Sequence, residues 1–208
     1  MKFLSSIIYF IMSITKQYSY DESHGMIHSF NTMHTAYKIY ENELHNHPEL
    51  KEQEKVILVS AVIHDMCDKK YMDEIDGISR IDNVLENHMS SKEILVVHDI
   101  VSGMSYSKVK KKGFPDMGDY QAAYNVVREA DLLEAYDFDR AMIYHLYHKN
   151  ADVKEAYKES LELFKKRMFR HEKDGLLTFE YTKTQAKQLK TRSIIRMKHW
   201  KKIIRAIK

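Results

Sequence analysis

The stretch VSAVIHDMCDKKY, residues 59–71, begins as an apolar run and ends in a cluster of charged side chains. Residues 56–63, VILVSAVI, contain one polar side chain, Ser60, which is typical of a helix buried on nearly all sides. His64 and Asp65 stand side by side where this run stops. Burying such groups without partners costs several kcal/mol, so we expect distant parts of the chain to supply a partner.

The composition predicts an all-α protein. The chain of 208 residues contains two prolines and six glycines, while the helix formers Leu, Lys, Glu, Met and Ala recur. Charged residues make up 30% and hydrophobic residues 44%, a balance that excludes global disorder. This length supports one well-buried core, so we expect residues 1–208 to form a single helical bundle.

The pattern of apolar residues and helix breakers predicts the approximate limits of the helices. We expect helices at 3–17, 22–45, 52–66, 72–87, 91–101, 119–136, 139–148, 151–172 and 179–205. Residues 105–120 contain Gly113, Pro115, Gly118 and a lysine cluster, and are expected to form one long loop that acts as a lid. The C-terminal helices would occupy residues 151–208.

The charge is distributed unevenly. The net charge of +3 gives no reason to expect nucleic acid as an obligatory partner, but residues 183–208 carry no acidic side chain. This basic, amphipathic segment is compatible with docking to RNA or a membrane. The alternative we favour is an ordinary terminal helix whose isoleucines pack on the core: Ile194, Ile195, Ile203 and Ile204.

The N-terminal segment and the cysteine count indicate the compartment. The apolar run in residues 1–16 is too short to span a bilayer and is followed by no small-residue cleavage site, so we expect a first helix packed on the core. We therefore expect no transmembrane segment. Cys67 is the one cysteine, which excludes an internal disulfide and fits a cytoplasmic protein.

Two further polar sites join His64 and Asp65 as candidates. His24 and His28 are four residues apart, so they share one face of a helix, and Asp131 interrupts the apolar segment READLLEAYDF, residues 128–138. Each site alone has a structural explanation: a satisfied histidine, a capped helix end, or a salt bridge from Asp131 to Arg128. Together, two imidazoles and two carboxylates make a mixed N/O set suited to a divalent transition metal.

The chain resembles the HD superfamily of metal-dependent phosphohydrolases, which is all-helical and named for its ordered motif H…HD…D. The matching segments are SHGMIHSFNTMHTA (23–36), AVIHDMCDKKY (61–71) and READLLEAYDF, and VHDIVSGMSYS (97–107) is similar to a segment of a branch of small bacterial nucleotide pyrophosphohydrolases. The resemblance covers about residues 18–140. It implies a helical domain of the HD type with metal ligands His28, His64, Asp65 and Asp131.

The resemblance implies one divalent ion, Mn²⁺ by preference, with Fe²⁺, Co²⁺, Ni²⁺, Mg²⁺ and Zn²⁺ as alternatives. It implies a nucleotide substrate, with release of pyrophosphate from a nucleoside triphosphate or of phosphate, and leaves a homodimer open. The alternative is a non-catalytic nucleotide- or metal-binding HD module whose basic C-terminal helix docks to RNA or a membrane.

Further residues are expected to act around the ion. Asp68 is expected to take a proton from the attacking water, His24 to donate to phosphate oxygen, and Lys70 to offset phosphate charge. Substrate binding is assigned to three lysines, Lys69 next to the motif and Lys108 and Lys112 in the expected lid. The alternatives are a surface pair of Asp68 with Lys69 and plainly solvated lysines.

Overall fold

The apolar segments fold as helices in the order that the sequence predicts. The structure, a computed structural model that describes residues 2–68 and 70–207, contains no strand in these ranges. The α-helices are α1 (Lys2–Gln17), α2 (Met26–Glu43), α3 (Leu50–Ile63), α4 (Glu74–Leu85), α5 (Ser91–Gly103), α6 (Tyr106–Lys112), α7 (Gln121–Glu134), α8 (Phe138–His148), α9 (Val153–Lys166) and α10 (Glu180–Ala206). Short 3₁₀ turns lie at Gly118–Tyr120 and Met168–Arg170. The expected all-α class is confirmed.

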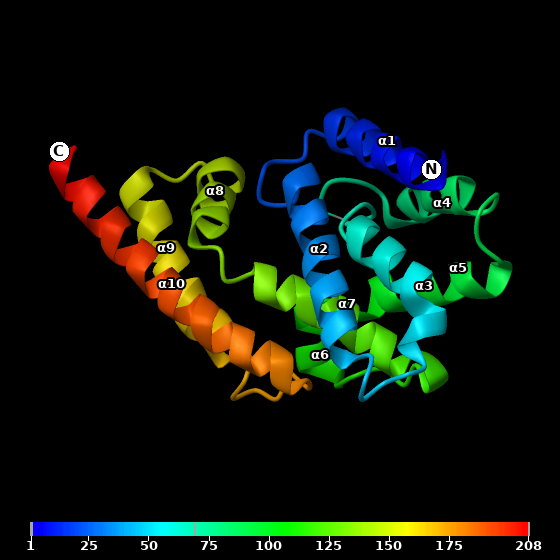
Figure 1. Cartoon of the computed structure of the whole chain (residues 1–208). Coiled ribbons are helices and arrows are strands. Elements are labelled where there is room, and N and C mark those ends of the chain that lie inside the picture. Colours follow the sequence, from blue (N-terminus) through cyan, green and yellow to red (C-terminus); the bar gives the residue numbers. More distant parts are fainter. Residues whose placement is uncertain (1, 69, 208) are drawn as a thin grey trace.

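Helices α2, α3 and α7 pack on one another and form the centre of the domain. Around them, α1, α4 and α5 lie on one side, and α8, α9 and α10 on the other (Figure 1). A large apolar cluster runs through α1 to α7, and a smaller one around Phe138 and Phe164 joins α8, α9 and α10. The strongly apolar α3 is buried along most of its length, as its sequence predicts.

Helix α1 packs on the core through one face. Ile7, Ile11 and Ile14 repeat at helical spacing and are at most 2% exposed. The expectation of a packed first helix is therefore confirmed. In the described part of the chain, no helix is both long and apolar enough to cross a bilayer.

The expected loop at 105–120 is wrong in part, because residues Tyr106–Lys112 form α6. Val109 buries its side chain and anchors this short helix, and Gly113 ends it with a positive φ of 81° that favours glycine. The breakers Gly113, Pro115 and Gly118 are thus confined to the segment after the helix.

Two further features, the end of α9 and the packing of α10, differ from expectation. Helix α9 ends at Lys166 rather than near residue 172, because Arg167 leaves helical geometry with φ −127° and ψ −71°. On α10, the expected packing of four isoleucines is wrong for two of them: Ile195 and Ile203 are 48% and 45% exposed, while Ile194 and Ile204 are half-buried. The C-terminal end of α10 projects past α9 (Figure 1).

Candidate metal centre

The four candidate ligands come from the ends of three central helices. His28 lies in the first turn of α2, and Asp131 lies in the last turn of α7. His64 caps the end of α3, and Asp65 follows in the turn. His64 keeps helical dihedral angles, with φ −55° and ψ −31°, so its side chain and that of Asp65 meet over the groove between two positions that differ by about 100°.

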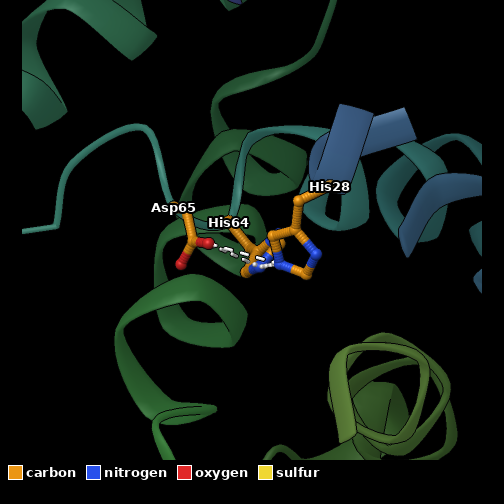
Figure 2. A group of neighbouring side chains, drawn as sticks. All are labelled: His28, His64 and Asp65. Atoms are coloured by element: carbon orange, nitrogen blue, oxygen red, sulfur yellow. Dashed lines mark hydrogen bonds and ion pairs between the residues drawn. The ribbon is translucent and has the colours of Figure 1, made fainter. Parts of the chain in front are cut away.

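The structure brings these four side chains together. His28 Nε2 lies 3.1 Å from His64 Nε2, 3.3 Å from Asp65 Oδ2 and 3.4 Å from Asp131 Oδ1. His64 Nε2 lies 3.2 Å from Asp65 Oδ2 and 3.6 Å from Asp131 Oδ1. Figure 2 shows the two imidazoles and the Asp65 carboxylate converging. His28, His64 and Asp65 form a group whose ligand atoms all lie within 4.8 Å of one another, a spacing that can hold a metal ion.

Hydrogen bonding orients the donor set. His64 Nδ1 lies 2.8 Å from the carbonyl oxygen of Ala61, which can only accept, so Nδ1 carries a proton and neutral His64 presents the Nε2 lone pair. His28 Nδ1 lies 3.5 Å from the hydroxyl of Thr32. Among the described residues, buried Asp65 Oδ2 has no hydrogen-bond partner of good geometry. An oxygen in this position fits a cation better than a purely structural contact.

The electrostatics of the unliganded chain reflect the same convergence. Burial opposes the charge on each group, but the charges of Asp65 and Asp131 outweigh this effect and raise the pKa of His64 to about 10. Burial also opposes the charges on Asp65 and Asp131, yet the neighbouring imidazoles hold the pKa of both carboxyls well below their usual range. The centre therefore favours two ionised carboxylates, the form that binds a cation.

A cavity of about 630 Å³ opens on this centre. Its volume falls within the range of roughly 300–1,000 Å³ that is typical of small-molecule sites. The walls include His64, Asp65 and Asp131. Apolar side chains and a few polar groups from α4 to α9 complete the lining, a mixture common in ligand sites.

His24 lines this cavity within a hydrogen-bonded cluster. Its Nδ1 lies 2.7 Å from the Ser23 hydroxyl and 3.1 Å from the Tyr71 hydroxyl. Tyr71 donates to buried Asp21 at 2.7 Å, and His148 Nε2 lies 2.5 Å from the same carboxylate oxygen. Burial lowers the pKa of His24 to about 4, so the ring is neutral at neutral pH. The sequence singled out His24 but not its partners.

The expected roles of Asp68, Lys70 and Lys69 stay predictions. Asp68 and Lys70 both line the cavity, and they pair with each other, with 3.2 Å between Lys70 Nζ and Asp68 Oδ2. Lys69 lies outside the described residues. The surface pair considered for Asp68 thus exists, but with Lys70 as the partner.

The lysines of α6 separate into two groups. Lys108 lines the cavity, and its Nζ donates to the Ser102 carbonyl at 3.0 Å. Lys112 is exposed at the end of α6 and is absent from the cavity wall formed by described residues. Lys110 pairs with Asp174. The substrate-binding roles of Lys108 and Lys112 stay predictions.

Asp131 does not pair with Arg128, the structural alternative raised for it. Arg128 instead lies 3.0 Å from Glu129 and donates to the Leu176 carbonyl. Asp131 faces Arg140, whose Nη1 lies 3.8 Å from Asp131 Oδ1 and whose Nη2 lies 4.0 Å from Asp65 Oδ2. Arg140 was not singled out from the sequence, because no local pattern relates it to the motif.

Comparison with known proteins supports the fold. No known family model matches the chain, and neither does any curated protein. A crystal structure of a protein from Lactobacillus plantarum, a structural-genomics target, has a TM-score of 0.70 and 17% sequence identity to this chain. The match covers 99% of this chain and 98% of that chain. At this identity, the similarity establishes the fold alone.

Proposed function

We propose that the protein is a metal-dependent phosphohydrolase of the HD type that acts on nucleotides. The observation that carries the proposal is the convergence of two imidazole nitrogens and two carboxylate oxygens on the wall of one cavity. The ordered H…HD…D motif supports the family, and the all-helical fold is compatible with it.

The residues fit a divalent ion. His28, His64, Asp65 and Asp131 would hold it, and their mixed N/O chemistry suits Mn²⁺, with the other divalent ions as alternatives. An ion bound there supplies Lewis acidity, which activates water and polarises a phosphoryl oxygen.

The chain's own groups would complete the site. His24 is neutral, and with Nδ1 accepting from the Ser23 hydroxyl its Nε2–H would donate a hydrogen bond to a phosphate oxygen. Asp68 would accept a proton from the attacking water, and its pairing with Lys70 would orient it. Lys108 would add positive charge to the wall of the cavity.

The test is a hydrolysis screen of nucleoside mono- and triphosphates with added Mn²⁺, in which phosphate and pyrophosphate are detected separately. We expect pyrophosphate from a triphosphate, or phosphate from a mono- or triphosphate. The Asp65→Ala variant should lose both Mn²⁺ retention and hydrolysis while keeping its helical circular dichroism signal. Asp99→Ala is the matched control, because Asp99 is an exposed aspartate on α5.

Full activity of Asp65→Ala would refute the assignment of the centre. An inactive wild-type protein that binds Mn²⁺ or nucleotide would favour the alternative of a non-catalytic binding module. One observation supports that alternative: α10 exposes Ile195 and Ile203 among basic residues and could dock to RNA or a membrane.

A further inference from the structure

Arg167 occupies an unusual position for an arginine whose side chain is half-buried. It directly follows α9, and its departure from helical geometry ends that helix. Its side chain lines the cavity that opens on the candidate metal centre. Arg167 Nε is buried without a hydrogen-bond partner, and none of the ion pairs within 4.0 Å among the described residues involves its guanidinium.

Arg128 provides a comparison, because it is a buried arginine that is paired within the chain. Its side chain is 1% exposed, and its Nε, like that of Arg167, is buried without a hydrogen-bond partner. Its Nη groups, however, bond to the Glu129 carboxylate, the Asn125 side chain and the Leu176 carbonyl, so its charge is compensated within the chain. A buried guanidinium stays charged, so leaving it without a counter-charge is costly. The contrast indicates that Arg167 is kept for a partner that is not part of the chain.

An aromatic ring holds Arg167 in place. The Arg167 guanidinium lies 4.1 Å from the centre of the Tyr106 ring, in the first turn of α6. Such a contact orients a guanidinium, and unlike a carboxylate it leaves the positive charge uncompensated and N–H groups free. Tyr106 also lines the cavity.

A second arginine connects Arg167 with the candidate metal centre. Arg140 lies within 4.0 Å of both Asp65 and Asp131 and donates to the Ser23 carbonyl, so its position is fixed. Burial lowers the pKa of Arg167; the charge of Asp131 opposes this effect and the like charge of Arg140 adds to it. Arg140 and Arg167 also line the same cavity, so both can contact one ligand bound there.

We propose that Arg167 and Arg140 form an anion subsite that takes the phosphoryl group of the substrate beside the metal centre, an inference that rests on the proposed function for its substrate class. Guanidinium groups match the oxygens of phosphate in a bidentate fork, and Arg167 retains this capacity. The scissile phosphate would contact the two arginines beside the carboxylates of the centre. The rest of the substrate would occupy the apolar part of the cavity.

The test is calorimetric titration of inorganic phosphate into the Mn²⁺-loaded full chain. We expect wild-type protein to bind phosphate, and Arg167→Met, which keeps the apolar stem, to bind it about tenfold more weakly or worse, the loss of a charge-assisted hydrogen bond. Mn²⁺ affinity, titrated separately, should stay within about twofold. Arg205→Met is the matched control, since Arg205 is exposed on α10.

Two further measurements sharpen the assignment. Arg167→Lys keeps the charge without the fork, so it should also weaken phosphate binding, and it replaces Arg167→Met if that variant loses its helical signal. Acetate should bind about tenfold more weakly than phosphate. Absence of phosphate binding by wild type, unchanged phosphate binding in Arg167→Met or in the Arg167→Lys replacement, or equal affinity for acetate would overturn the subsite.

The same proteins separate this inference from the proposed function. If wild type hydrolyses no nucleotide but binds phosphate through Arg167, the proposed function is wrong and the subsite stands. If wild type hydrolyses a nucleotide and Arg167→Met shows unchanged KM and phosphate affinity, the subsite is wrong and the proposed function stands.

Discussion

Replacing Glu129 by glutamine should destabilise the whole domain, because this carboxylate joins α7 to the start of α10. Glu129 is fully buried, at 0% exposure. Its Oε1 accepts hydrogen bonds from the backbone N–H and the hydroxyl of Thr178, at 2.8 and 2.6 Å. Its Oε2 accepts a hydrogen bond from the hydroxyl of Thr182. Arg128, also buried, contributes its charge from 3.0 Å.

The size of the expected loss in stability follows from Arg128, whose charge stays buried when Glu129 is replaced. Removing one member of a buried ion pair costs about 3–5 kcal/mol, because the other charge stays buried without compensation. Arg128 retains its bond to the Leu176 carbonyl, and the amide of the variant still offers one acceptor oxygen. We therefore expect the lower end, a loss of about 3 kcal/mol in the free energy of unfolding.

Urea unfolding followed by circular dichroism measures this loss. Glu180→Gln is the matched control, because Glu180 is 87% exposed and its pair with Lys183 lies at the surface, where such pairs contribute about 1 kcal/mol or less. The double variant Arg128→Met/Glu129→Gln should lose less than the sum of the single losses. A loss below about 1 kcal/mol in Glu129→Gln would refute the argument that this pair anchors α10.

Three other predictions concern the centre and its surroundings. Saturating Mn²⁺ should raise the melting temperature of wild type and of Asp99→Ala but not of Asp65→Ala. An ion that binds only the folded state, at a concentration of about 100 times its Kd, adds roughly 2.7 kcal/mol to the free energy of unfolding. Equal shifts in all three proteins would contradict the assigned ligands. Gly77→Ala should lower the free energy of unfolding by about 1–3 kcal/mol, because the added Cβ would lie 2.7 Å from both Cys67 Cβ and Met72 Sδ. This loss should outweigh the helix preference of alanine, and a variant that is more stable in urea would contradict this packing. Burial and the charge of Arg167 lower the pKa of His171 to about 3 in the folded chain, from its usual value of 6.5. Between pH 6.5 and pH 3, the unfolded chain therefore binds a proton at His171 that the folded chain does not bind. Stability should therefore fall as the pH drops from 6.5 toward 3, by up to about 1.4 kcal/mol per unit, and His171→Leu should flatten this dependence in urea unfolding measured from pH 7.5 to 5; parallel curves for the two proteins would refute it.

The sequence predicts the features that depend on local pattern. The apolar run of α3 and the spacing of Ile7, Ile11 and Ile14 on α1 specify buried faces, because burial follows helical periodicity. His64 and Asp65 were identifiable because charged groups at the end of an apolar run require partners.

Features that depend on which helices face one another were not predictable in this way. Arg140 and Arg167 belong to α8 and to the turn after α9, and no local spacing relates them to His28 or Asp131. The burial of Glu129 depends on where α10 begins, 50 residues later in the chain. Helix α6 was missed because its three consecutive lysines obscure the single buried Val109 that anchors it.

The location of the candidate ligands at helix ends has a consequence for how the centre tolerates change. His28 lies in the first turn of α2, Asp131 lies in the last turn of α7, and His64 and Asp65 follow α3, so the four ligands are held by three helices. These three helices pack on one another, and the spacing between the ligand atoms therefore depends on helix docking rather than on any one loop. Metal sites require ligand positions accurate to a few tenths of an ångström. A substitution that shifts one helix slightly should thus weaken metal binding before it unfolds the domain, and stability alone would underestimate its effect on function.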